Sequence, residues 1–536
     1  MNELSGTRER WDEVDETEVL IAGADPVGLA LALDLERRGV RCLVLEHGDG
    51  RVATPEVSPI GPRSMELFRR WGVADKIRCA EFPGARPPDI AWTTQVGGHE
   101  IHRFERFTHD THTPEPEQIC PADWLLPVLQ TAVGTYPGGA VLFRHQLDGF
   151  TQDADGVTAR VTNLATGQRL TIRAGYLVST TGPCSLIRSA CGIQATPRFG
   201  PQFLRSIVFR APGLAEGLAA RGHRPALTYF LLQPDGLRFP LQAMDGDGRF
   251  KLIAGSGVGA IDAETLVRDA IAFDTPTEVL SDEQTSVPLM VADRYRAGRV
   301  FLMGGAAHTL SAPGGFGRNI GIADAADLGW KLAAEHAGWA GLGLLDSYDA
   351  ERRPVALEGL EAAGLALRGR GADTLSARLR DDTPDGVLAR TELGLQLAES
   401  VAHWDADAPE VHFGHGYRSS LVVGDEVKMT VPWQPGSDPG FRAAHAWLRP
   451  GVSTLDVFGD GFVLLCFQGH ERIADVERAF ARRGVPLAVV RCSDEKVAEL
   501  YRQPFVLVRP DDHVAWRGPQ PPTDPLLLAD MVRGAC

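Results

Sequence analysis

Residues 18–46 constrain the fold of this chain more than any other segment. An apolar run, EVLIAG, ends in a glycine at Gly23, and residues 27–38 (VGLALALDLERR) then predict a helix that stops at Gly39. A second apolar run, VRCLVLE, ends at Glu46. Strand, glycine turn, helix, strand and acid follow in the order of a βαβ unit that binds a dinucleotide. The chain is therefore predicted to be an α/β protein.

Composition narrows the protein class. At 536 residues the chain is long enough for about three domains. A formal net charge of −16 argues against partners such as nucleic acid or an anionic membrane. The polar N-terminus and the lack of an apolar run of about 18 residues predict neither a secretory signal nor a membrane span. The eight cysteines form no CxxC pair, so we expect a cytoplasmic protein with reduced thiols.

No metal site is expected. The closest spacing of potential ligands is His99 and His102, and the glycines beside them favour a solvated loop.

The pattern of elements predicts three domains and a linker. Alternating strands end the first segment, short strands with Pro and Gly turns fill the middle, and helices rich in Leu, Ala and Arg follow. After a polar stretch, the last part alternates strands and helices. We expect a first domain from residues 1–190 and 291–400, a middle domain over 191–290, a linker over 401–419 and a C-terminal domain over 420–536.

The chain resembles the class A flavoprotein monooxygenases, and within them the FAD-dependent aromatic polyketide hydroxylases. The resemblance rests on VLIAGADPVGLALALDLERRGV, RSMELFRRWGV, YLVSTTGPCSLIR, RVFLMGGAAHTLSAPGGFGRNIGIADAADLGWKLA and LLDSYDAERRPVA. It implies a Rossmann-like FAD domain, a middle β-sheet domain that contacts substrate, and a thioredoxin-like C-terminal domain. It also implies FAD, NADPH and oxygen as co-reactants.

Several positions depart from the family pattern where the flavin would bind. Gly23 and Gly28 keep the outer glycines of the fingerprint, but Asp25 replaces the middle one. A carboxylate about 4 Å from a phosphate charge would oppose it by roughly 4 kcal/mol, or about a thousandfold in affinity. The other departures are Glu56 for an arginine, Ala122 for a glutamine, Thr181 and Gly305 for aspartates, and Phe316 for a glutamine.

Read together, these departures predict a kept fold with a lost FAD site. We therefore expect no cofactor, although Glu46 remains at the ribose-binding position. The alternative is an FAD- and NADPH-dependent hydroxylase with weakened affinity for FAD.

Without flavin, acid–base chemistry would have to come from side chains. His308 and Asp324 match family positions near the flavin, although a bracing or capping role would also explain them. In the middle domain the candidates are Tyr229, His223 and Arg205, each of which could equally be a core, surface or ion-paired residue.

The predicted function is flavin-independent tailoring of an aromatic or polycyclic polyketide intermediate by cyclisation, dehydration, ring opening or rearrangement. A non-catalytic binding or partner protein is the third hypothesis. The expected partner is a small molecule, and a homodimer is compatible with the sequence.

Overall fold

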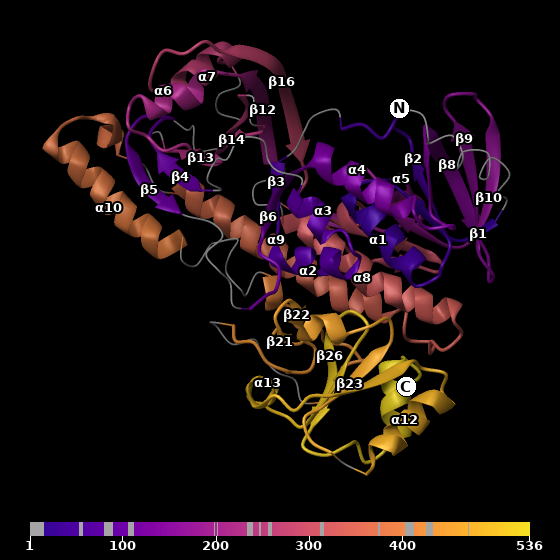
Figure 1. Ribbon diagram of the computed structural model, residues 1–536. Coiled ribbons are helices and arrows are strands. Elements are labelled where there is room, and N and C mark those ends of the chain that lie inside the picture. Colours follow the sequence, from indigo (N-terminus) through magenta and orange to yellow (C-terminus); the bar gives the residue numbers. More distant parts are fainter. Residues whose placement is uncertain are drawn as a thin grey trace.

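The computed structural model describes residues 16–536 except 53–56, 80–88, 105–111, 198, 201, 233–239, 246–247, 256–259, 311–315, 373–375, 402–411, 425–432 and 470. Three sheet-based parts are arranged around two long helices, α8 (Phe316–His336) and α9 (Ser347–Ala372) (Figure 1). The predicted α/β class is confirmed. Across the described residues, no helix combines the length and apolar composition that a membrane span requires.

The first sheet is built on the predicted βαβ unit. Its main path runs in the order β18-β19-β10-β1-β2-β7, and β1 pairs in parallel with both β10 and β2. The central strands are apolar and buried, as expected for a parallel sheet covered on both faces. Its strands are β1 (Glu16–Ala22), β2 (Cys42–Glu46), β7 (Ala140–Phe143), β8 (His145–Gln152), β9 (Val157–Asn163), β10 (Arg169–Ser179), β18 (Arg296–Ala297) and β19 (Val300–Leu302).

Helix α1 (Pro26–Arg37) packs closely against α8. A Cβ atom added at Gly329 would lie 2.2 Å from the carboxylate of Asp34, which shows how near the two helices approach. Asp34 is buried, and Arg38 and Trp71 donate hydrogen bonds to it. The other helices of this part are α2 (Pro62–Arg70), α3 (Ala74–Cys79), α4 (Ala122–Val133) and α5 (Leu186–Ala190). Small sheets join β3 (Val57–Ile60) to β6 (Gln118–Pro121), and β11 (Ala195–Pro197) to β17 (Met290–Ala292) and β20 (His308–Thr309).

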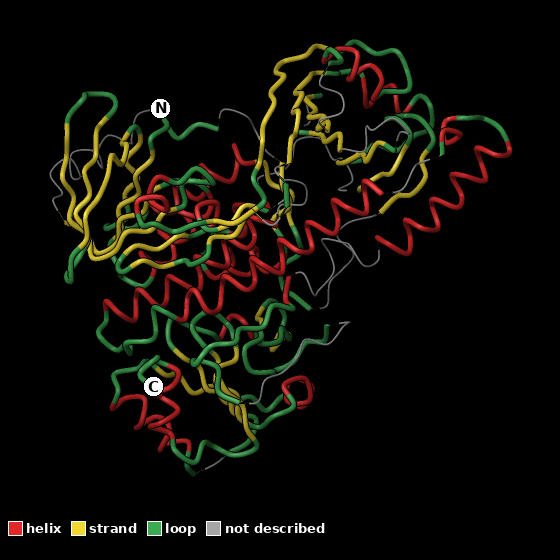
Figure 2. The backbone as a smooth tube through the Cα atoms, turned by 180° about the vertical axis from the view of Figure 1, so that it is seen from behind, coloured by secondary structure: helices red, strands yellow, loops and turns green. Residues whose placement is uncertain are grey.

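The middle part is a seven-stranded sheet with the order β16-β12-β15-β14-β13-β4-β5. Two of its strands, β4 (Ile90–Thr93) and β5 (Glu100–Phe104), come from a segment that the sequence assigned to the first domain. The others are β12 (Gln202–Arg210), β13 (Thr228–Leu231), β14 (Pro240–Ala243), β15 (Arg249–Gly255) and β16 (Glu278–Val287), with α6 (Leu214–Ala219) and α7 (Ala263–Ala270). Helix α9 extends from beneath the first sheet toward this part, and α10 (Pro384–Val401) returns beside β5 (Figure 2).

The C-terminal part has a four-stranded sheet in the order β24-β23-β25-β26 and lies against α8 and α9 (Figure 1). Trp330 of α8 belongs to its hydrophobic core and packs edge-on against Phe462. Its elements are β21 (Trp447–Arg449), β22 (Val452–Ser453), β23 (Phe462–Cys466), α12 (Ile473–Arg482), β24 (Leu487–Arg491), α13 (Glu495–Tyr501), β25 (Phe505–Val508), β26 (Val514–Gly518) and α14 (Pro525–Val532).

A buried group of charges joins this part to the first. Arg509 donates to Glu351 at 2.6 Å and to Asp327 at 3.0 Å, and Lys331 donates to the same two carboxylates at 2.6 and 2.7 Å. Asp511 also accepts from Arg509. Three carboxylates thus face two cations, and burial raises the pKa of Asp327 well above its usual range. Because these buried charges need one another as partners, they fix how α8, α9 and the C-terminal sheet are placed against one another.

Replacing Arg509 with methionine is expected to lower the free energy of unfolding by about 3–5 kcal/mol, because buried carboxylates lose their partner. The control is Arg37→Met, which removes a partly exposed ion pair with Asp460 across the same two parts and should cost less than about 1 kcal/mol. Urea denaturation followed by circular dichroism measures both. Equal losses in the two variants would contradict this account of the junction.

Candidate functional site

The site begins at the turn between β1 and α1. Gly23 has a φ of +115°, which side chains rarely adopt, and a Cβ atom added at Gly28 would lie 2.1 Å from the carbonyl oxygen of Gly23. Both positions therefore require glycine. The turn brings the N-terminus of α1 against the end of β1, which is the close approach that a dinucleotide fingerprint provides.

Glu46 closes the other side of this turn from the end of β2. One carboxylate oxygen accepts a hydrogen bond from the amide of Ala24 at 3.0 Å, and the other accepts from the amide of Gly48 at 2.8 Å. The side chain is thereby fixed at the carboxyl edge of the sheet, where dinucleotide folds bind a ribose. The structure therefore brings Gly23, Gly28 and Glu46 together, as the sequence spacing predicts.

Asp25 caps the N-terminus of α1 with its own carboxylate. One oxygen accepts from the amides of Val27 at 3.0 Å and Gly28 at 2.8 Å. Desolvation raises the pKa of this carboxyl to about 6, helped by the charge of Glu46 and opposed by the two amides and the Thr180 hydroxyl. Amide groups that would otherwise face an anion at a helix N-terminus are thus bonded to a side chain.

The far wall of the turn comes from β10 and from the short 3₁₀ turn η2 (Gly304–Ala306). Thr180 donates to the carbonyl oxygen of Gly23 at 3.2 Å, and the Thr181 hydroxyl lies within 3.0–3.1 Å of those of Ser179 and Ser185. A Cβ atom added at Gly305 would lie 3.0 Å from the Cα of Gly182, so the two segments touch through their backbones.

The sequence predicts lost flavin contacts at three further positions, Ala122, Glu56 and Phe316. Ala122 begins α4, is 7% exposed and carries no polar group on its side chain. Glu56 lies outside the described residues, as does the side chain of Phe316.

His308 and Asp324 form a buried pair beside η2. The Nε2 atom of His308 lies 2.9 Å from Asp324, which also accepts from the Gly304 amide at 3.3 Å. Arg352 donates to the other oxygen of Asp324 at 2.7 Å. Desolvation raises the pKa of Asp324, but Arg352 and His308 outweigh it and hold the pKa below its usual range. His308 is 2% exposed, so the pair braces the turn from inside.

Arg352 is the residue that sequence reasoning missed. It lies in the block DAERRPVA, which carries the family resemblance but was given no role. Its guanidinium is buried and also donates to the Tyr417 hydroxyl at 3.0 Å, a contact that joins segments far apart in the chain and that local sequence pattern does not reveal.

The middle-domain candidates lie on a different sheet. Arg205 on β12 pairs with Asp282 on β16 at 2.7 Å. Tyr229 on β13 is 3% exposed, and its hydroxyl accepts from the amide of Ala226 at 2.8 Å. Each of these polar groups is therefore bonded within the protein.

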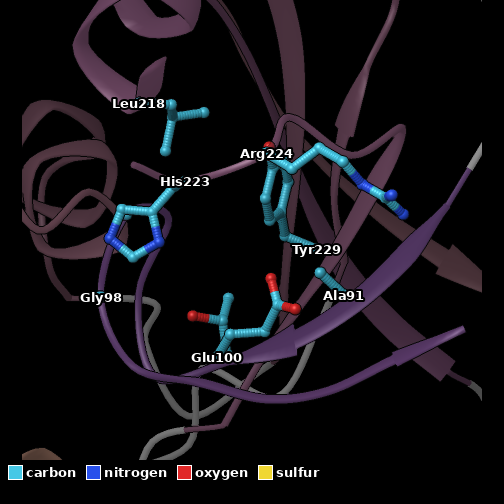
Figure 3. Close-up of a pocket in the computed structure, with 9 residues that line it drawn as sticks. Ala91, Gly98, Glu100, Leu218, His223, Arg224 and Tyr229 are labelled. Atoms are coloured by element: carbon cyan, nitrogen blue, oxygen red, sulfur yellow. The ribbon is translucent and has the colours of Figure 1, made fainter. Parts of the chain in front are cut away.

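A small depression separates His223, Glu100 and Tyr229 (Figure 3). The space that it encloses is about 10 Å³, room for about one water molecule, whereas pockets that bury a small molecule measure roughly 300–1,000 Å³. The depression is therefore too small for a polycyclic substrate. In the described part of the chain, no three His, Cys, Asp or Glu side chains gather as metal ligands.

Two protein-family models match this chain. A family model described as an FAD binding domain matches residues 16–363, and one described as the C-terminal domain of aromatic-ring hydroxylases matches residues 437–534. Aklavinone 12-hydroxylase RdmE of Streptomyces purpurascens is 32% identical over 94% of this chain and 95% of its own length.

Several solved structures match nearly the whole chain. The rebeccamycin biosynthetic enzyme RebC, solved with reduced flavin, is 50% identical, with a TM-score of 0.92 over 98% of this chain and 100% of RebC. Aklavinone-11 hydroxylase, solved with FAD and aklavinone, is 30% identical, with a TM-score of 0.80 over 96% of this chain and 98% of its own.

The expectation of no cofactor is wrong. The match to an FAD binding domain and the flavin in similar structures point to FAD as the cofactor. The local geometry agrees, because the tight turn at Gly23 and Gly28 and the fixed carboxylate of Glu46 fit a dinucleotide. Each departure predicts the loss of one contact, whereas the turn at Gly23 and Gly28 and the Glu46 carboxylate keep the geometry that a dinucleotide needs. Asp25 is the one residue of the turn that opposes a diphosphate.

Replacing Gly28 with alanine should displace α1, because the new methyl group would overlap the Gly23 carbonyl. We expect a loss of about 1–3 kcal/mol in stability, with weaker FAD binding. Gly459→Ala is the control, since a Cβ atom there meets nothing within 4 Å. Thermal melting and FAD titration measure the effects. Unchanged FAD affinity in Gly28→Ala would contradict the placement of the site.

Proposed function

Because the chain belongs to the class A flavoprotein monooxygenase family, we propose that it is an FAD-dependent enzyme that oxidatively tailors a polycyclic aromatic small molecule. The observation that carries this proposal is the dinucleotide turn of Gly23, Gly28 and Glu46, which lies inside the segment matched by the FAD binding domain. Bound FAD would supply electron transfer between a nicotinamide, oxygen and the substrate, which side chains cannot perform alone.

The chain's own residues would bind and orient the cofactor. Glu46 would accept hydrogen bonds from a ribose, and the turn at Gly23 would allow the backbone to approach the diphosphate. On the far wall, the Thr181 hydroxyl stands where the family has a carboxylate and offers a neutral donor and acceptor instead.

Asp324 acts as a positioning residue in this scheme. It accepts from the Gly304 amide and is itself held by Arg352 and His308, so η2 keeps its shape at the edge of the site. A general acid or base must reach the proton that it transfers. His308 and Tyr229 are nearly fully buried and bonded within the protein, which favours the flavin over a side chain as the reactive group.

The degree of similarity favours a substrate of the kind bound by RebC. RebC has been solved with bound 7-carboxy-K252c, and the RebC in that structure is 51% identical to this chain, whereas the aklavinone hydroxylases are 30–32% identical. Pocket-lining residues change with substrate more readily than the fold does. We therefore place 7-carboxy-K252c and related compounds ahead of aklavinone as candidate ligands.

The test is to load the purified protein with FAD and supply NADPH, oxygen and one candidate compound at a time. We expect oxygen uptake and NADPH oxidation that depend on both FAD and the compound, with a product changed in mass. Candidates of the 7-carboxy-K252c type should act at lower concentrations than aklavinone. Binding of these compounds without any oxygen uptake or product would contradict oxidative tailoring.

A further inference from the structure

Asp25 lies at the start of α1, which is where dinucleotide folds bind a diphosphate. Its carboxylate accepts from the amides of Val27 and Gly28, which are the first free amides of α1. The free amides and the positive end of the helix dipole lie at the N-terminus of α1, a helix of 12 residues. An amide that already donates to Asp25 is not free to donate to a phosphate oxygen. The Asp25 carboxylate and an FAD diphosphate therefore compete for the same donors.

The charged groups around Asp25 make this competition sensitive to protons. Glu46 faces it from the end of β2 and adds a second negative charge. His47 lies beside Glu46, with Nδ1 3.1 Å from the carboxylate, and is mostly exposed. Thr180 contributes a hydroxyl from the end of β10, and η2 contributes only glycines and an alanine. In the described residues of these elements, the charge that acts on the Asp25 carboxyl is that of Glu46.

We propose that Asp25 makes FAD binding proton-linked, so that FAD binds as one solvent proton is transferred to the Asp25 carboxyl. The inference rests on the proposed FAD dependence and goes beyond it, since it concerns how the affinity for FAD depends on pH. Protonation removes the negative charge, releases the two amides to the diphosphate and leaves a hydroxyl that can donate to a phosphate oxygen.

The direction of the pH dependence follows from the charge. The pKa of Asp25 in the FAD-free protein is about 6, so the carboxyl is neutral below that pH and ionised above it. The diphosphate raises this pKa further, because it favours the neutral form. The dissociation constant for FAD should therefore rise with pH above 6, with a slope that approaches about tenfold per pH unit until the raised pKa is passed.

The experiment measures the dissociation constant of FAD by quenching of its fluorescence on FAD-free protein, from about pH 5.5 to about pH 8. The unmodified protein should bind roughly 50-fold more weakly at pH 8 than at pH 6, because about half of the Asp25 carboxyls are already ionised at pH 6 and nearly all are at pH 8. Asp25→Asn keeps a helix cap without the charge and should bind FAD with nearly constant affinity. Asp25→Gly restores the family residue and should behave in the same way.

Two control variants separate this effect from others. Asp494→Asn changes an aspartate that caps α13 in the same manner, far from the turn, and should leave the pH dependence intact. His47→Gln removes the imidazole next to Glu46 and should also leave it intact.

A flat profile in the unmodified protein, or a slope that persists in both Asp25 variants, would overturn the inference while leaving FAD dependence standing. If neither the unmodified protein nor Asp25→Gly binds FAD at any pH, the proposed function and the inference both fail.

Discussion

The close approach of α1 to the end of β1 is the constraint on which the rest of the site depends. With only hydrogen at Gly28, the helix starts against the Gly23 carbonyl, and Thr180 bonds the same carbonyl from the neighbouring strand. This contact aligns the carboxyl ends of β1, β2 and β10 around one point. Glu46, Thr181 and η2 then line the edge where ligands of open α/β sheets bind.

The edge is kept in shape by charges buried behind it. Asp324 ties the Gly304 amide to His308 and Arg352, and Arg352 reaches on to Tyr417 near the C-terminal part. One turn further along α8 lies Asp327, and Lys331 follows after another turn; both enter the ion pairs around Arg509. Helix α8 therefore links the cofactor edge on one side to the C-terminal sheet on the other. Removing one partner of such a buried pair leaves an unpaired charge and lowers the free energy of unfolding. The pairs therefore favour one placement of the first part against the C-terminal part.

Much of this fold follows from sequence pattern, and the reasons for the exceptions are physical. The apolar strands and the glycine turn at Gly23 predict the βαβ unit correctly because periodicity and turn chemistry are local. The joining of β4 to β13 depends on partners far apart in the chain, which local pattern does not reveal. The same holds for Arg352, whose role appears only when α9 packs on α8. A catalytic role for His308, Tyr229, His223, Arg205 and Asp324 stays a prediction from the sequence.

The error on the cofactor has a specific cause. Each substitution at the flavin contacts was read as a missing bond, whereas binding depends on the whole frame of backbone and carboxylate that survives around Asp25. Asp25 is better understood as a competing anion whose charge depends on pH. That view reconciles a family that binds FAD with a turn that carries an acid in place of glycine.

The most direct test of this account is calorimetry of FAD binding at pH 7 in buffers that differ in ionisation enthalpy, which counts the protons taken up. With a pKa of about 6 in the free protein, Asp25 is about nine-tenths ionised at pH 7. The account predicts uptake of close to one proton per FAD bound, and none in Asp25→Asn. Binding of FAD to the unmodified protein with no net proton uptake would contradict it.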